Sequence, residues 1–233
     1  MEYWNFLHLL THYSIVSLFH SSIGVSMLFP LSSQPMDYFE RMYYRRGYRQ
    51  IAGLDEVGRG PLAGPVVAAA VILPRDGIGP QLYDSKQISS KKRGDLYPVI
   101  LSESLGVGIG IISQEEIDQL NIFQATLKAM ILAIQNLPLP PDFLLIDGTQ
   151  GLKFSIPQKS IPKGDQLSNS IAAASIVAKV TRDRLMEAYH PQYPQYNFAK
   201  HKGYGTKEHQ QAIKAFGVCD LHRKTFRGVK EYL

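Results

Sequence analysis

The sequence predicts an α/β fold, because short apolar runs typical of buried strands alternate with helical segments along most of its 233 residues. Two runs rich in Val, Ile and Ala lie within residues 51–73, on either side of a polar hinge. A short, wholly apolar run at residues 143–146 ends in Asp147. A further strand is expected at residues 105–112, and helices are expected at residues 89–102, 114–137 and 168–189.

Composition indicates a folded protein with an anionic partner. Hydrophobic residues make up 45% of the chain, which is enough for a sizeable core and too much for a disordered protein. The net charge of +5 and the pI of about 9.2 favour an anionic partner without identifying one. The single cysteine, Cys219, excludes an internal disulfide and a cysteine-rich zinc site, so we expect a reducing, cytoplasmic setting.

Residues 1–45 are expected to form an N-terminal extension, and residues 46–233 the main domain. The extension has no run long and apolar enough for a membrane span, and no basic segment that would suit a secretory signal. Three interpretations stay open: a membrane-surface helix, a disordered extension, or a start assigned too early, with Met27, Met36 and Met42 as later starts.

A segment rich in arginine and tyrosine, residues 37–50, leads into the first strand. Such a mixture could contact nucleic acid by charge and stacking. A solvated leader to the strand is the alternative interpretation.

The polar hinge after the first strand holds the first candidate site. Asp55 falls where the strand should lie in the core, and Glu56 follows it. An ionised carboxylate is costly there unless it is paired or holds a metal, although an acidic pair after a strand is also typical of a solvated turn. Gly58 and Gly60 flank Arg59 and would let a phosphate approach the main chain. This combination indicates metal-assisted phosphodiester chemistry.

The segment before the first long helix offers a weaker candidate. Ser85 and Lys86 follow a loop and could hold a phosphate by hydroxyl and ammonium, but a serine here equally suits a helix cap. Ser113 begins a capping box at the following helix, and Asn121 predicts a break within that helix.

Two more carboxylates come later in the chain. Asp147 lies at the carboxyl end of a buried strand, where open α/β sheets place ligands, although an Asp-Gly turn is the alternative. Asp165 comes just before the last long helix and could simply cap it. Both could meet Asp55 and Glu56 only if the first and fourth strands lie side by side and that helix begins over them.

Asp183 lies further along the same helix, between Arg182 and Arg184. We interpret this triplet as a surface ion-pair network. Residues 200–230 hold eight Lys or Arg against two acidic residues, which favours a surface that follows phosphates, with a solvated tail as the alternative.

Several motifs follow one another between Ile51 and Lys230. They are GLDEVGRGPLAGP at residues 53–65, DSK at 84–86, LIDG at 145–148, KGD at 163–165, IAAASIVAK with TRD at 171–183, HKGY at 201–204 and HRKTF at 222–226. Together they resemble the ribonuclease HII family, and several motifs in order are far more specific than any one of them. Residues 1–45 lie outside the resemblance.

The resemblance implies an RNase H-like fold, with a mixed central β-sheet flanked by helices and a helical C-terminal region. It implies an endonuclease that hydrolyses the RNA strand of RNA/DNA hybrids and nicks ribonucleotide-containing duplex DNA on the 5′ side of single ribonucleotides. The products would carry 3′-hydroxyl and 5′-phosphate ends. The family's four catalytic and metal-binding acids fall on Asp55, Glu56, Asp147 and Asp165.

The resemblance also implies substrate-binding residues. The family's ribonucleotide-sensing triplet falls on Gly58, Arg59 and Gly60, and its partner tyrosine on Tyr204, which could otherwise be a hydrophobic cover for the core. Weaker candidates for holding flanking DNA phosphates are Ser85, Lys86 and Lys179.

Carboxylates suit Mn²⁺ or Mg²⁺, both hard, oxygen-binding ions. Two ions about 3.5–4 Å apart could clamp the scissile phosphate. In this hypothesis Asp55 bridges both ions, Glu56 and Asp147 complete the ligands of one, and Asp165 those of the other.

We expect a monomer with no membrane association, acting in DNA replication and repair. The related ribonuclease HIII proteins lack the arginine of the triplet and carry a different N-terminal domain, so Arg59 argues against that alternative. A non-catalytic nucleic-acid-binding module is the alternative from another class, and the intact set of four acids argues against it.

Overall fold

The computed structural model describes residues 34–79 and 89–233. The chain divides into two units, Met1–Pro35 and Met36–Leu233, and every described helix and strand lies in the second. That unit contains a five-stranded sheet in the order β3-β2-β1-β4-β5. Its strands are β1 (Ile51–Val57), β2 (Val66–Ile72), β3 (Gly106–Ile112), β4 (Phe143–Asp147) and β5 (Gln158–Ile161).

The sheet is mixed, because β1, β2 and β3 pair antiparallel whereas β1, β4 and β5 pair parallel. The described helices are α2 (Tyr38–Arg45), α3 (Ser90–Glu103), α4 (Gln114–Leu120), α5 (Ile122–Gln135), α6 (Asn169–Tyr189), α7 (Phe198–His201) and α8 (Lys207–Phe216). Short 3-10 turns are η4 (Gly164–Gln166), η5 (His190–Gln192), η6 (Pro194–Tyr196) and η7 (Lys230–Tyr232). The predicted α/β class, with a mixed sheet and a helical C-terminal region, is confirmed.

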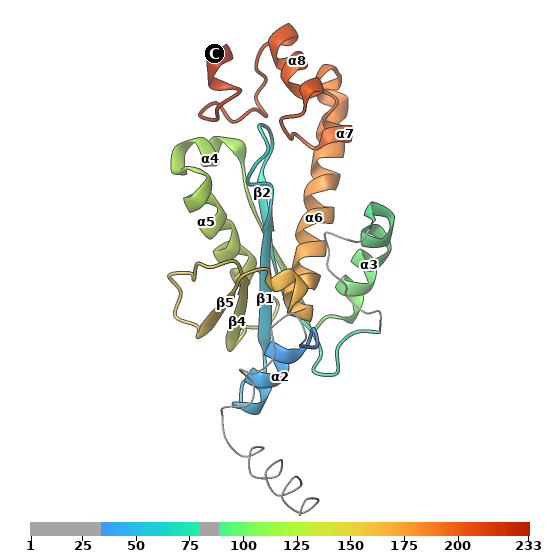
Figure 1. Cartoon of the computed structure of the whole chain (residues 1–233), viewed down its shortest axis with the longest axis vertical. Coiled ribbons are helices and arrows are strands. Elements are labelled where there is room, and N and C mark those ends of the chain that lie inside the picture. Colours follow the sequence, from blue (N-terminus) through green and yellow to red (C-terminus); the bar gives the residue numbers. More distant parts are fainter. Residues whose placement is uncertain (1–33, 80–88) are drawn as a thin grey trace, which may run out of the picture. The chain divides into compact units, whose positions relative to one another are not determined.

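Helices cover both faces of the central strands. All seven residues of β2 are buried, because even-numbered residues pack with α5 and odd-numbered residues pack with α3 and α6. Figure 1 shows α5 and α6 on opposite sides of β1 and β2. A strand buried on both faces has no polar alternation, which explains the continuous apolar run in the sequence.

Glycines in β3 allow α5 to lie directly on the sheet. A Cβ at Gly108 would lie 2.0 Å from the carbonyl oxygen of Ala133, and a Cβ at Gly110 would lie 2.0 Å from that of Ala129. Any side chain at these two positions would therefore push the helix away from the strand.

The predicted element boundaries are largely confirmed. The helix expected at residues 114–137 is divided into α4 and α5 at Asn121, whose φ is +69° and whose Oδ1 accepts from the amides of Phe123 and Gln124. Ser113 caps α4, and Ser168 caps α6. Strand β5 was not foreseen, because its polar sequence QKSI lies within a basic-polar segment at the edge of the sheet.

Helix α2 packs on the sheet, although its residues fall within the N-terminal extension expected at residues 1–45. Phe39 and Tyr43 lie on one helical face and are both buried, and the Tyr43 ring stacks on Phe143 at 3.8 Å. Glu40 on the same helix is also buried, and its Oε1 accepts from Ser168 Oγ at 2.6 Å and from Ser170 N at 2.9 Å. The compact unit therefore begins at Met36, ten residues before the boundary expected at residue 46.

None of the helices in the described ranges, residues 34–79 and 89–233, is long and apolar enough to span a membrane. The open question of a membrane-surface helix concerns residues 1–33, which lie outside those ranges.

Candidate active site

Strands β1 and β4 place two acids at the same end of the sheet. They pair in parallel with Leu54 opposite Ile146, and the next residues along the two strands are Asp55 and Asp147. The four acids could meet only if the first and fourth strands were neighbours, and the pairing of β1 with β4 meets that condition. A parallel pair brings carboxyl ends to one edge of the sheet, so two acids that are far apart in sequence become adjacent.

Helix α6 begins directly over β1. A Cβ at Gly53 would lie 2.1 Å from the carbonyl carbon of Ser170, so only a glycine allows the first turn of α6 to lie on the strand. The turn η4 precedes this helix, and its Gly164 N–H donates to Asp147 Oδ1 at 2.7 Å. The segment that carries Asp165 is thereby bound to the end of β4.

Three carboxylates act on one another at this edge, and we call Asp55, Glu56 and Asp147 the carboxylate group. Asp55 is 5% exposed, and its Oδ1 accepts from the Glu56 amide at 2.7 Å. Burial, followed by the charges of Asp147 and Glu56, holds the pKa of the Asp55 carboxyl well above its usual range. Burial also raises the pKa of Glu56, against the opposing effect of Arg59, whose Nη1 lies 3.1 Å from Glu56 Oε1.

Asp165 lies in η4 and its side chain is fully buried. Within the two described ranges, no group of three or more His, Cys, Asp or Glu residues has the arrangement of a metal site. The structure therefore gathers the carboxylate group and ties the Asp165 turn to it, without placing all four acids around one point.

The two glycines around Arg59 have different surroundings. Gly58 is buried, has a φ of +96°, and a Cβ there would lie 2.3 Å from Arg182 Nε. Gly60 is exposed, and a Cβ there would have nothing within 4 Å. Packing alone therefore requires a glycine at 58, whereas the open backbone at 60 is free to meet a ligand.

Two buried arginines hold the loop at residues 58–65. Arg182, on α6, donates to the carbonyl oxygens of Pro65 and Ala63 at 2.9 and 3.1 Å. Arg223 donates to three further carbonyl oxygens, from Nη2 to that of Gly58 at 2.6 Å, from Nη1 to that of Arg59 at 3.0 Å and from Nε to that of Gly64 at 3.0 Å. Both side chains are 0% exposed. These bonds fix the main chain around Arg59.

Burial lowers the pKa of Arg182 to about 10 and that of Arg223 to about 9. The hydrogen bonds of Arg182 and Arg223 go to neutral carbonyl oxygens, so both guanidinium groups add positive charge behind the loop at residues 58–65. An anionic ligand in front of that loop would be attracted to it.

The prediction that Arg182 belongs to a surface ion-pair network with Asp183 is wrong, because the Arg182 side chain is buried. Helical periodicity could have revealed this, because Arg182 lies four residues from Ala178 and from Met186, on the same buried face of α6. Asp183 instead binds Lys179 Nζ at 2.7 Å. Lys179, a candidate phosphate ligand, therefore has an internal ion-pair partner.

Tyr204 lies on a loop beside residues 58–65. The amide of Leu62 donates to the carbonyl oxygen of Gly203 at 2.8 Å, and Arg182 Nη1 donates to that of Lys202 at 2.9 Å. The Tyr204 side chain is 39% exposed, and its ring centroid lies 5.8 Å from the guanidinium carbon of Arg182. Its exposure argues against a role as cover for the core.

Other predicted binding residues stand apart from this arrangement. Ser85 and Lys86 lie outside the described residues. In the basic C-terminal region, Lys200 pairs with Glu208 and Lys202 pairs with Glu187, so part of its positive charge is neutralised internally.

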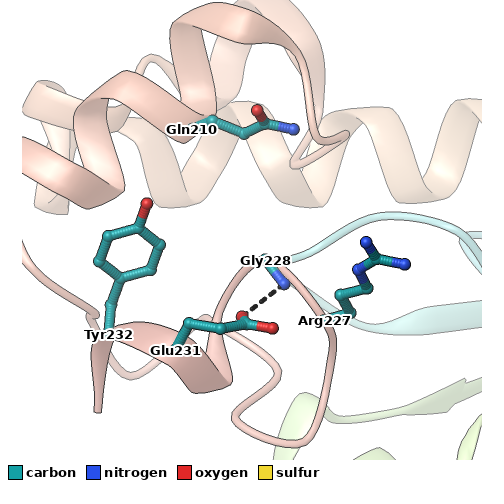
Figure 2. Close-up of a pocket in the computed structure, with 5 residues that line it drawn as sticks. All are labelled: Gln210, Arg227, Gly228, Glu231 and Tyr232. Atoms are coloured by element: carbon teal, nitrogen blue, oxygen red, sulfur yellow. Dashed lines mark hydrogen bonds between the residues drawn. The ribbon is translucent and has the colours of Figure 1, made fainter.

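A pocket of about 450 Å³ lies in the same C-terminal region, as Figure 2 shows. Gln210, Arg227, Gly228, Glu231 and Tyr232 line it, and Glu231 Oε2 accepts from the amide of Gly228 at 2.7 Å. No residue of the carboxylate group contributes to its lining, so it is separate from the candidate site.

Comparisons with known proteins agree with this geometry. A family model described as Ribonuclease HII matches residues 52–229. A ribonuclease HII of Syntrophus aciditrophicus is 58% identical over 192 residues, which cover 82% of this chain and 91% of the relative.

Solved structures share the fold. Ribonuclease H2 from Pyrococcus horikoshii OT3 has a TM-score of 0.68 at 23% identity, over 79% of this chain and 97% of that one. Bst-RNase HIII in complex with Mn²⁺ has a TM-score of 0.61 at 20% identity, over 85% of this chain and 73% of that one. The predicted RNase H-like fold is therefore confirmed.

Proposed function

The chain belongs to the ribonuclease HII family, and we propose that it hydrolyses the RNA strand of RNA/DNA hybrids and also nicks duplex DNA on the 5′ side of single ribonucleotides. Family membership makes it a ribonuclease H, a metal-dependent endonuclease acting on RNA/DNA hybrids. Nicking at single ribonucleotides, and the roles of individual residues, are the finer part of the proposal.

The carboxylate group is the observation that carries the proposed chemistry. Three mutually repelling carboxyls, one of them buried, are a donor set that suits hard divalent cations such as Mn²⁺ or Mg²⁺. The Mn²⁺ complex of the related ribonuclease HIII supports this choice of ion. To hold ions, the side chains must turn toward one another, because they do not yet form a metal site in the described residues.

In this proposal Asp55, Glu56 and Asp147 hold one ion, and Asp165 joins Asp55 in holding a second. Bound divalent ions would supply activation of a water molecule and stabilisation of the leaving 3′ oxygen. Asp55 keeps its orientation through the bond from the Glu56 amide, and Asp147 keeps its orientation through the bond from the Gly164 amide. Cleavage would leave a 3′-hydroxyl and a 5′-phosphate.

Recognition of the ribonucleotide is assigned to two loops, residues 58–65 and the loop that carries Tyr204. RNA differs from DNA at the 2′-hydroxyl, which must be contacted for discrimination. The exposed main chain at Gly60, the Arg59 side chain at its rim and the exposed Tyr204 ring lie on two loops that hydrogen-bond to each other. The charges of Arg182 and Arg223 behind these loops support binding of the phosphate backbone.

The protein is proposed to act as a monomer in the cytoplasm, during DNA replication and repair. Its partners would be RNA/DNA hybrids and ribonucleotide-containing duplex DNA. The basic net charge of +5 supports an anionic partner of this kind.

The test is cleavage of two duplexes in Mn²⁺ or Mg²⁺, one with a single ribonucleotide in DNA and one with a long RNA strand paired to DNA. Wild-type protein should cut both, and should nick the first on the 5′ side of the ribonucleotide. Tyr204→Phe should reduce cutting of the single-ribonucleotide duplex, since it lacks the hydroxyl. Cutting of the long hybrid alone would refute nicking at single ribonucleotides.

A further inference from the structure

Three buried histidines surround the loop that carries Tyr204. His201, His209 and His222 are 7%, 0% and 1% exposed. The rings of His201 and His209 stack at 4.5 Å with an interplanar angle of 17°, and the centroids of His209 and His222 are 5.2 Å apart. None of the three belongs to the carboxylate group.

The hydrogen bonds of His209 and His222 form a chain that connects Cys219 to the loop of Tyr204. His209 Nδ1 lies 3.0 Å from the carbonyl oxygen of Tyr204, which can only accept, so Nδ1 carries the proton. His209 Nε2 lies 3.1 Å from His222 Nε2, so one nitrogen must donate to the other. Three atoms of Cys219 face His222 Nδ1: the amide nitrogen at 3.0 Å, Sγ at 3.1 Å and the carbonyl oxygen at 3.3 Å. The amide is the nearest of the three and can only donate, and the carbonyl oxygen already accepts from the His222 amide at 3.0 Å, so Nδ1 acts as an acceptor.

The protons of the chain follow from these contacts. With both rings neutral, His222 carries its proton on Nε2 and donates to His209 Nε2, and His209 donates from Nδ1 to Tyr204. A second proton on His209 would place two N–H groups face to face at 3.1 Å. A second proton on His222 would oppose the Cys219 amide. The geometry therefore selects neutral imidazoles with one tautomer each.

His201 holds the other side of the same loop. Its Nε2 faces the carbonyl oxygen of Tyr196 at 2.6 Å, and its Nδ1 accepts from the amide of Gly203 at 3.2 Å. The stacked rings of His201 and His209 therefore hydrogen-bond to the amide of Gly203 and to the carbonyl oxygen of Tyr204, respectively. Bonds from Leu62 to Gly203 and from Arg182 to Lys202 anchor the loop to the rest of the site.

The surroundings keep the chain uncharged. Burial lowers the pKa of both His209 and His222 to about 4, and burial lowers the pKa of His201. The charge of Glu208 raises the pKa of His201 and the charge of Lys200 lowers it, and these two side chains pair with each other at 2.9 Å. Cys219 Sγ lies 3.1 Å from His222 Nδ1, and burial raises the pKa of this thiol, so it too stays neutral.

We propose that His222 and His209 form a relay of neutral imidazoles that positions Tyr204 for reading the ribonucleotide. The relay runs from the Cys219 amide through both rings to the Tyr204 carbonyl, and it holds the main chain while the aromatic ring stays exposed. His209 and His222 are positioning residues, because they act through Tyr204. The role of Tyr204 in this inference rests on the proposed function.

The first test does not depend on activity. ¹⁵N NMR of the imidazoles in the full chain, at pH 7 without metal, distinguishes the two neutral tautomers. His209 should be protonated at Nδ1, and His222 at Nε2. Both should stay neutral when the pH is lowered to 5.5. Protonation of His209 at Nε2, or titration of either ring near pH 6.5, would overturn the relay.

A matched pair of substitutions tests the positioning. The amide nitrogen of asparagine stands near Nδ1 of histidine, and that of glutamine stands near Nε2. His209→Asn should keep the donation to Tyr204, whereas His209→Gln should keep only the contact with His222. The loss of one buried hydrogen bond predicts about a fivefold to tenfold rise in KM for the single-ribonucleotide duplex in His209→Gln, with kcat nearly unchanged. His209→Asn should stay within about twofold of wild type, because the bond to Tyr204 remains.

A double-mutant cycle separates positioning from general destabilisation. In a Tyr204→Ala background, His209→Gln should cause no further rise in KM, because its effect passes through Tyr204. An equal rise in both backgrounds would refute the relay's role in positioning, and so would a Tyr204→Ala variant with wild-type KM. If wild type cuts neither duplex, the proposed function fails, and the proposed role of Tyr204 fails with it. The tautomers measured by NMR then still show whether His209 and His222 form the relay. If His209→Gln does not fold, the tautomers of wild type still decide.

Discussion

Replacing Asp55 by asparagine removes one buried negative charge that faces two other carboxylates. The folded-state pKa of Asp55 is raised, so this group contributes stability at low pH that is lost as the pH rises through that pKa. Asparagine cannot ionise, and its Oδ1 can still accept from the Glu56 amide. We therefore expect Asp55→Asn to be more stable than wild type without metal, by a margin that grows with pH.

The size of the gain follows from the kind of change. Single stabilising substitutions, among them changes that remove unfavourable charge interactions, commonly add about 0.5–2 kcal/mol. For a chain of this length, each kcal/mol raises Tm by roughly 2–4 °C. With metal bound, wild type should become more stable than Asp55→Asn. A divalent ion at 100 times its Kd would stabilise wild type by about 2.7 kcal/mol and the variant by less.

The assay is thermal unfolding in EDTA across a pH series, then in Mn²⁺ or Mg²⁺, with cleavage measured on the same samples. Asp95→Asn is the matched control, because Asp95 is exposed on α3 and should change neither Tm nor cleavage. The reasoning is refuted if Asp55→Asn lowers Tm in EDTA throughout the pH series. Retained cleavage with Mg²⁺ would remove Asp55 from the proposed catalytic residues.

Three further predictions concern the surroundings of the site. Gly58→Ala should destabilise the protein by about 1–3 kcal/mol in urea unfolding, since its φ is +96° and a Cβ would meet a buried guanidinium, whereas Gly60→Ala should leave stability unchanged and raise KM. Glu40→Ala should lower the free energy of unfolding by about 2–4 kcal/mol, because two buried serines lose their hydrogen-bond acceptor. Glu40→Gln keeps an acceptor oxygen and should lose less, so equal losses in the two variants would contradict this explanation. The contribution of His209 to the free energy of unfolding, measured as the difference between wild type and His209→Asn, should fall as the pH drops from about 6.5 toward 4. Its folded-state pKa is about 4, so the unfolded chain binds the proton first, and a difference that stays constant over this range would be inconsistent with a neutral buried ring.

Local sequence determined the order of most elements. The apolar runs predicted four strands close to their observed bounds, and the break in the helix at Asn121 followed from a residue that interrupts an otherwise apolar pattern. Ser113 was recognisable as a helix cap because capping is a local interaction between a side chain and nearby amides. Strand β5 was missed because a polar edge strand has no apolar periodicity.

The proposed site depended on a mixture of local and non-local information. Ordered motifs indicated the family, and they named Asp55 and Asp147 as partners. Their adjacency, however, comes from the parallel pairing of β1 and β4, which no spacing along the chain determines. The approach of η4 likewise depends on Gly53, which allows α6 to lie on β1.

The sequence by itself determined which residue types were present, the alternation of strands and helices, and the family. Only the tertiary structure decided that Arg182 is buried and Arg184 is exposed, and that His209 and His222 hold the loop of Tyr204. Arginine and histidine are polar in any sequence pattern, and their burial is stable only when distant carbonyl and amide groups satisfy their hydrogen bonds. Those partners come from segments up to 165 residues away, so the packing of the whole domain determines them.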